Sequence, residues 1–320
     1  MGMGCLTMTG DVATDYAALL DDEVRAFIAR TEEFYPPDAV DLSITDQRRV
    51  YDALCVAFDY PHPEGVRVRD TEASGVPVRI YNAGDPSATI VYFHGGGFVV
   101  GGLESHDAIC AELCAGTGYR VVAVDYRLAP EHVFPAAFED AIAATRWVGE
   151  RYEGRILLAG DSAGGNLAAA VSGALRGQDI RLRGQVLIYP GLGGNRDARS
   201  YHEHAFAPGL TAADVDFYHE VYGAGAERAG NPRLAPLEDS DFSGLPPTVV
   251  ITADCDPLRD DGPAYCDALA GAGVRAHCIN ENGLIHGYLR ARYVSQKARD
   301  SFERIVAALQ CLGQGLWPYD

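Results

Sequence analysis

Lysine is almost absent from this sequence, since Lys297 is the only one among 320 residues. Together Lys and Arg number 26 against 45 Asp and Glu, which gives a formal net charge of -19 at pH 7. No polybasic segment is present that could hold nucleic acid or an anionic membrane surface, and a strongly acidic protein surface repels both. The charge therefore excludes nucleic acid and membrane as expected partners.

Long apolar runs are also missing. A helix that crosses a bilayer needs about 18 or more consecutive apolar residues, and the longest apolar runs here are short and resemble strands. Residues 1–11 lack the basic start and the continuous apolar stretch of a secretory signal. The sequence therefore predicts a cytoplasmic protein.

The eight cysteines are scattered and include no Cys-x-x-Cys pair. Disulfide frameworks are typical of small secreted chains, and zinc sites need tighter clusters, so we expect reduced, buried thiols. Two alternatives could suggest a metal site: Cys110 and Cys114, which lie four residues apart on an expected helix, and His202 and His204, which flank Glu203 in an expected solvated loop. We expect neither a metal nor an organic cofactor.

Short stretches rich in β-branched residues alternate with helical patterns along most of the chain. The expected helices are 105–117, 136–152 and 163–176, and the expected strands are 77–81, 88–93, 120–125, 155–160, 184–189, 247–253 and 274–279. Such alternation is typical of βαβ units, whose right-handed crossovers place helices on both faces of the sheet. The predicted fold class is α/β with a mostly parallel central sheet.

Two regions fall outside this alternation. Residues 1–60 contain two amphipathic helical stretches, and residues 191–244 are rich in glycine, proline and charge with one helical piece. We interpret both as elements of a helical cap, with residues 61–190 and 245–320 forming the catalytic domain. A peripheral helical arm is the alternative for the first region.

Ser162 stands at the centre of the strongest local motif, Gly-Asp-Ser-Ala-Gly at 160–164. An apolar run precedes this motif and an alanine-rich helical stretch follows it. A G-x-S-x-G turn between a strand and a helix holds a serine in a strained, exposed conformation that suits a nucleophile. The pattern therefore predicts Ser162 as a catalytic nucleophile.

A second motif, His-Gly-Gly-Gly-Phe at 94–98, follows directly after the expected strand 88–93. Ester cleavage passes through a tetrahedral oxyanion, which backbone N–H groups about 3 Å away stabilise. Glycines allow the main chain to supply such donors. A phosphate-binding loop is the alternative, but the glycine spacing fits neither a P-loop nor a dinucleotide fingerprint.

Together these motifs resemble the bacterial hormone-sensitive-lipase family of α/β-hydrolases, whose members include GDSAG-type carboxylesterases. The resemblance continues through Asp-Tyr-Arg-Leu-Ala-Pro-Glu at 125–131, Asp-Pro-Leu-Arg-Asp-Asp-Gly at 256–262 and His-Gly-Tyr at 286–288. It covers the chain from about residue 90 to 288, in order. The one departure is Tyr288, which stands where family members often have phenylalanine.

The resemblance implies an α/β-hydrolase fold and a catalytic triad of Ser162, Asp256 and His286. The order of these residues in the chain supports the same triad independently, because serine, acid, histidine is the order found in α/β-hydrolases. Each of the three also follows an expected strand. Asp254 is the alternative acid at the same strand end.

The resemblance also implies an oxyanion hole formed by the N–H groups of Gly96, Gly97 and Ala163. Phe98 and Tyr288 are the aromatic residues that we expect to line the substrate pocket, and Tyr189, Phe206 and Phe217 are further candidates. Asp260 and Asp261 are expected to face solvent on the first turn of the next helix, where acidic groups complement the helix dipole.

These features predict a serine carboxylesterase that hydrolyses small, short-chain esters through an acyl-enzyme intermediate. An amide or formamide hydrolase of the same fold is one alternative, and a non-catalytic ligand receptor is another. A homodimer formed through the expected last strand, 274–279, is also predicted, because an unpaired sheet edge is a ready surface for pairing.

Overall fold

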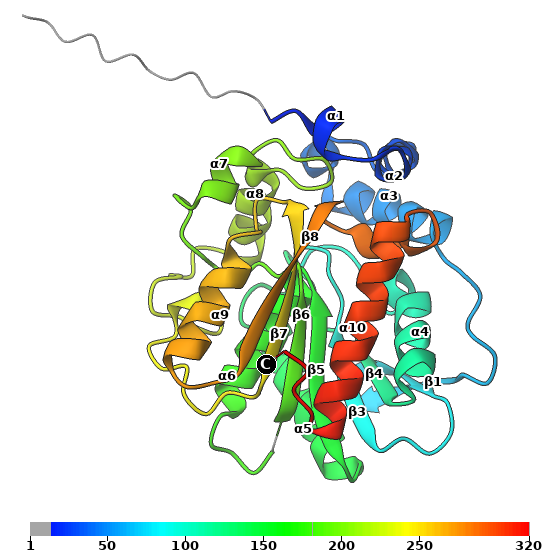
Figure 1. Ribbon diagram of the computed structural model, residues 1–320, viewed down its shortest axis with the longest axis vertical. Helices are drawn as coiled ribbons and strands as arrows, with labels where there is room; N and C mark the ends of the chain where they lie inside the picture. The colour runs from blue at the N-terminus through cyan, green and yellow to red at the C-terminus, as the bar shows by residue number, and fades with distance from the viewer. Residues whose placement is uncertain (1–13, 181, 320) are drawn as a thin grey trace, which may run out of the picture.

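A single mixed sheet crosses the protein in the computed structural model, which describes residues 14–180 and 182–319 (Figure 1). Its eight strands lie in the order β1-β2-β4-β3-β5-β6-β7-β8. β1 pairs antiparallel with β2, which pairs antiparallel with β4, and the remaining neighbours are all parallel. The predicted α/β fold with a mostly parallel sheet is confirmed.

The strands have these bounds: β1 Arg67–Ala73, β2 Val76–Asn82, β3 Ala88–Phe93, β4 Arg120–Val124, β5 Arg155–Asp161, β6 Leu182–Ile188, β7 Thr248–Cys255 and β8 Ala276–Ile285. The helices that flank the sheet are α4 Asp107–Thr117, α5 Ala136–Arg151, α6 Ala163–Leu175, α9 Asp261–Gly271 and α10 Gln296–Gln314. Helices α4 and α10 cover one face, and α5, α6 and α9 cover the other (Figure 1).

The central strands bury both of their faces. All six residues of β3 are buried, and the consecutive residues Ile90 and Val91 belong to two different hydrophobic cores. Successive side chains of a strand point to opposite faces, so one core lies beneath α4 and α10 and the other beneath α5, α6 and α9. This explains why the inner strands appear in the sequence as continuous apolar runs.

The remaining helices gather at the end of the sheet toward which β7 and β8 point (Figure 1). They are α1 Tyr16–Leu19, α2 Asp22–Glu32, α3 Ile44–Ala57, α7 Arg199–Glu203 and α8 Ala212–Gly223. The described residues also form 3₁₀ turns at Ala39–Asp41 (η1), Glu104–His106 (η2), Pro236–Glu238 (η3) and Tyr288–Tyr293 (η4). Asp21, Ser43 and Thr211 cap the N-termini of α2, α3 and α8 through their side chains. Of the predicted cap region 1–60, residues 1–13 lie outside the described residues.

Two strands depart most from expectation, while the others differ from their expected bounds by at most two residues. β1 was not expected, because its residues are mostly charged and exposed, and only its pairing with β2, from Arg67 with Asn82 to Ala73 with Val76, makes it a strand. β8 runs on to Ile285, well past the expected end at residue 279, because Asn280 and Glu281 pair with β7 despite their polarity. Within residues 14–180 and 182–319, no helix combines the length and apolarity needed to cross a bilayer.

Candidate active site

Ser162 occupies the turn between β5 and α6. Its backbone has φ 55° and ψ -118°, a conformation that costs free energy for any residue with a side chain. The turn is tight because a Cβ atom on Gly164 would lie 1.9 Å from the carbonyl oxygen of Phe93, so only glycine fits there. The sequence thus folds into the sharp strand-to-helix turn that the motif predicted, and the Ser162 hydroxyl stands at the carboxyl end of the sheet.

His286 lies between Ser162 and Asp256. Its Nε2 is 2.9 Å from the Ser162 Oγ, and its Nδ1 is 2.6 Å from Oδ2 of Asp256. Asp256 is fully buried, and its other oxygen accepts the amide of Leu258 at 2.9 Å. A carboxylate at Nδ1 keeps the proton on that nitrogen and leaves the Nε2 lone pair facing the hydroxyl. Three segments far apart in the sequence therefore meet as one hydrogen-bonded line.

The other acidic residues near Asp256 have different partners. Asp254 accepts hydrogen bonds from the Asn280 side chain at 2.9 Å and from the amide of Gly283 at 3.2 Å, which directs it toward β8. Asp260 accepts the amide of Ser200 at 2.9 Å. Neither arrangement places a carboxylate against His286.

Asp261 was expected to face solvent, but the structure buries it. It is 1% exposed, and its Oδ2 accepts the amides of Leu192 at 2.8 Å and Gly194 at 3.2 Å, while its Oδ1 accepts the Tyr201 hydroxyl at 3.3 Å. Burial raises the pKa of Asp261 to about 6, although these hydrogen bonds oppose the shift. The carboxyl thus fastens the start of segment 191–244 to α9, a role that the position of the residue in a first helical turn did not reveal.

The glycine loop beside Ser162 presents free main-chain donors. Gly96 and Gly97 have φ values of +124° and +61°, which favour glycine. Among the described residues, no recorded hydrogen bond takes the amide of Gly96, Gly97 or Ala163, and all three residues line the same cavity as Ser162. These amides are therefore available to an oxygen atom bound next to the serine hydroxyl.

The buried side chain of His94 holds this loop in place. Its Nδ1 lies 2.8 Å from the carbonyl oxygen of Gly95, and its ring stacks on Tyr126 at 4.3 Å between centroids. Burial lowers the pKa of His94 to about 4, so the ring is neutral at pH 7. A buried, neutral ring held by stacking braces the loop.

Asp161 joins the glycine loop to the nucleophile turn, a link that sequence reasoning missed. This buried carboxylate accepts hydrogen bonds from the Tyr92 hydroxyl at 2.7 Å, the Gly95 amide at 3.0 Å, His106 Nε2 at 3.2 Å and the Tyr189 hydroxyl at 3.4 Å. Burial alone raises the pKa of Asp161, but His106, the Tyr92 hydroxyl and the charge of Arg290 hold it well below its usual range. The only sequence signal was its position next to Ser162.

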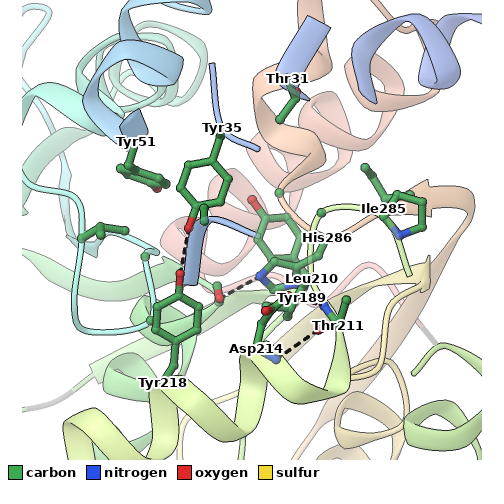
Figure 2. A pocket seen from close by; sticks show the side chains of 18 of the residues that line it. Thr31, Tyr35, Tyr51, Tyr189, Leu210, Thr211, Asp214, Tyr218, Ile285 and His286 are labelled. Carbon is green, nitrogen blue, oxygen red and sulfur yellow. Dashed lines mark hydrogen bonds between the residues drawn. The ribbon is translucent and has the colours of Figure 1, made fainter. Parts of the chain in front are cut away.

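A cavity of about 430 Å³ opens above the triad. Its walls come from Ser162, from His286 and from both predicted cap regions, including Tyr35 after α2 and Tyr218 of α8. The hydroxyls of these two tyrosines are hydrogen-bonded at 3.0 Å across the cavity (Figure 2). Tyr218 also packs on the glycine loop, where a Cβ atom on Gly97 would lie 2.3 Å from its ring. The two cap regions and the glycine loop thus enclose one space.

Of the two aromatic residues expected in the pocket, Phe98 lines the cavity and Tyr288 does not. Gly287, with φ +76°, turns the chain, and Tyr288 is buried in the core with its hydroxyl 2.7 Å from Ser301. Tyr189 lines the cavity instead, with its ring centroid 4.8 Å from that of His286 and 5.1 Å from that of Tyr288. Tyr288 therefore supports the pocket from beneath.

The cysteines are free thiols wherever the structure describes them. Seven of them fall within the described residues as free thiols, five of them buried, and Cys5 lies outside those residues. Cys110 and Cys114 are packed in the core on α4. In the part of the chain that the structure describes, no group of three or more His, Cys, Asp or Glu side chains is arranged to hold a metal ion.

Known proteins resemble this chain along most of its length. A family model described as alpha/beta hydrolase fold matches residues 90–290. The carboxylesterase NlhH of Mycobacterium tuberculosis is 39% identical over 250 residues, which cover 73% of this chain and 78% of that protein. An ethyl acetate hydrolase from Pseudomonas putida is 36% identical over 248 residues, which cover 73% of this chain and 78% of that protein.

Solved structures agree with the sequence comparison. A hyperthermophilic esterase from the archaeon Pyrobaculum calidifontis has a TM-score of 0.83 and 34% identity, and the alignment covers 92% of this chain and 99% of that chain. A thermostable esterase from Pseudomonas putida ECU1011 has a TM-score of 0.84 and 30% identity, with coverage of 91% and 97%. The chain therefore belongs to the α/β-hydrolase family, in the branch that resembles hormone-sensitive lipase, as its motifs predicted.

Proposed function

We propose that this protein is a serine carboxylesterase that hydrolyses small, short-chain carboxylic esters through an acyl-enzyme intermediate. The proposal rests on the hydrogen-bonded chain from Ser162 through His286 to buried Asp256. Main-chain amides without a recorded acceptor among the described residues lie beside Ser162 in the same cavity. The enzymes to which the chain is similar, named carboxylesterase, esterase and ethyl acetate hydrolase, support it.

In the first half of the reaction, the Ser162 hydroxyl attacks the ester carbonyl carbon. His286 Nε2 accepts the hydroxyl proton, and Asp256 stabilises the resulting imidazolium through its hydrogen bond to Nδ1. The amides of Gly96, Gly97 and Ala163 donate to the oxyanion, whose charge is greater than that of the ground-state carbonyl oxygen. His286 then gives its proton to the departing alcohol, which leaves the acyl group on Ser162.

In the second half, water replaces the alcohol. His286 accepts a proton from the water as it attacks the acyl carbon, and the same amides hold the second oxyanion. Ser162 leaves with the proton returned by His286, and the carboxylic acid departs. Both halves use groups of the chain and water.

The size of the cavity supports a small substrate. About 430 Å³ is near the lower end of the range for ligand sites, and apolar side chains such as Leu210, Val215 and Leu258 form much of its wall. Tyr35 and Tyr218, which meet across the cavity, are among the side chains that limit its size. A short acyl chain fits this space more readily than a long one.

The test is ester hydrolysis by the purified chain and by its Ser162→Ala variant. We expect kcat to fall by a factor on the order of 10⁴ or more in the variant, because the hydroxyl is the attacking group. A p-nitrophenyl ester series of increasing acyl length should give its highest kcat/KM at short chains. Turnover that survives the substitution would show that the nucleophile is misassigned, and a maximum at long chains would contradict the short-chain proposal.

Amide or formamide hydrolysis uses the same groups, so a matched pair of substrates separates it from ester hydrolysis. The pair is an aryl ester and the anilide of the same acid. We expect a higher kcat/KM for the ester, and a preference for the anilide would overturn the assignment. A ligand receptor without catalysis would turn over neither substrate.

A further inference from the structure

Arg290 is a buried cation in the wall of the active-site cavity. It belongs to η4, four residues after His286, and it is 8% exposed. The same cavity is lined by Ser162, Tyr51 and Arg290. A positive charge therefore lies within the space that encloses the triad.

The recorded partners of Arg290 leave its charge without a direct counterion. Its Nη1 donates to the carbonyl oxygen of Ser105 at 2.9 Å, and its Nη2 donates to the Tyr51 hydroxyl at 2.9 Å. Among residues 14–180 and 182–319, no carboxylate is recorded within 4.0 Å of its guanidinium. A guanidinium has five N–H donors, and burying its charge is costly unless it is paired and hydrogen-bonded.

Its neighbour Arg292 shows the contrast. Arg292 is 3% exposed, and it makes a two-pronged ion pair with Glu112 at 2.9 and 2.6 Å. It does not line the cavity. Two arginines of one short turn are thus buried, and the one that faces the cavity lacks the carboxylate that the other has.

Asp161 is a buried carboxylate whose charge acts on Arg290, but the two side chains form no recorded ion pair within 4.0 Å. Its oxygens accept hydrogen bonds from Tyr92, Gly95, His106 and Tyr189. Burial lowers the pKa of His106, so this ring adds a hydrogen-bond donor and no full charge at pH 7. Among the described residues, the remaining guanidinium N–H groups of Arg290 therefore have no recorded acceptor.

We propose that Arg290 binds a second oxygen function of the ester substrate, a ketone or carboxylate oxygen that lies away from the scissile carbonyl. The inference rests on the proposed ester hydrolysis and names the substrate class within it, esters of oxygen-bearing acids or alcohols. Arg290 donates to the oxygen, and Tyr51 holds the guanidinium in place through Nη2. The apolar wall formed by Phe27, Leu54 and Ile109 packs on the carbon chain.

Matched ethyl esters test this binding site. Ethyl valerate, ethyl levulinate and monoethyl succinate have acyl groups of similar size. The valerate has no second oxygen function, the levulinate has a ketone and the succinate has a carboxylate. A second set with acyl groups one carbon longer, and a set of acetates with and without a ketone in the alcohol, locate the oxygen along the substrate. Rates are measured by pH-stat titration.

We expect the wild-type kcat/KM of at least one oxygen-bearing ester to exceed that of its matched apolar ester by about tenfold or more, the size of a charge-assisted hydrogen bond. In Arg290→Met this ratio should fall to about one, and in Arg290→Lys it should fall only in part. A higher kcat/KM for the succinate ester than for the levulinate ester would show that Arg290 recognises the negative charge. Equal values would show that it recognises only the hydrogen-bond acceptor. Both outcomes support the site.

Arg67→Met is the control, because it removes the same charge from an exposed position on β1, far along the sheet from the triad. Its ratio should equal that of the wild type. The ratio of kcat/KM between matched esters stays informative even if Arg290→Met loses some activity, because both esters are measured on the same protein. Titration with a phosphonate inhibitor counts the competent active sites. The inference is overturned if no wild-type pair differs, or if Arg290→Met retains the preference. Failure of the proposed function is distinguishable, because the wild type would then hydrolyse none of these esters.

Discussion

The buried carboxyl of Asp261 makes the stability of this protein depend on pH. In the folded chain its pKa is about 6, whereas its ordinary value is 3.8. Between these two values the folded state holds a proton that the unfolded state has released, so protonation stabilises the fold. This contribution is fully present below pH 3.8 and is lost as the pH rises through 6.

The size of the effect follows from the gap between the two pKa values. A pKa gap of about two corresponds to about 3 kcal/mol of unfolding free energy between the protonated and ionised limits. Asp261→Asn removes this dependence, because an amide is neutral throughout. Its side-chain oxygen can still accept the amides of Leu192 and Gly194, which both bond to one oxygen of the carboxylate. The variant should therefore be more stable than the wild type at pH 8, by about 1–3 kcal/mol, and the difference should shrink by pH 5.

Urea unfolding followed by tryptophan fluorescence at a series of pH values between 5 and 8 measures this difference. Asp267→Asn is the matched control, because Asp267 lies exposed on the same helix, α9, and its replacement changes the net charge equally. The quantity compared is the change in unfolding free energy with pH for each chain. Parallel curves for the wild type and Asp261→Asn would refute the assignment of a raised pKa to this residue.

Three further predictions concern the triad, the nucleophile turn and assembly. Asp256→Asn should lower kcat by about 10³-fold or more with little change in KM, because the His286 tautomer is no longer fixed; steady-state kinetics measure it, and a loss confined to KM would count against the assigned role. Gly164→Ala should lower the melting temperature and the yield of folded protein, because its methyl group would meet the Phe93 carbonyl oxygen at 1.9 Å; an unchanged melting curve would contradict the described packing. The predicted homodimer through β8, which lies at the sheet edge, should give twice the chain mass in light scattering, and a monomer mass would remove it.

Most elements of the fold could be predicted because their signals are local. The buried inner strands are continuous apolar runs, and the Ser162 turn requires small residues at fixed positions next to the nucleophile. β1 could not be predicted, because its exposed, charged residues become a strand only by pairing with β2. Asp261 was misjudged for a similar reason, since the amides that bury it come from a segment some seventy residues earlier.

The sequence by itself determined the fold class and the order of the motifs, because strand and helix periodicity and the strand-to-helix turn depend on near neighbours in the chain. Only the tertiary structure decided which groups meet in the cavity. It placed Tyr189 where Tyr288 was expected, and it left Arg290 facing the cavity while Arg292 paired with Glu112. These outcomes depend on contacts between segments that the chain brings together only on folding, so no local pattern could have indicated them.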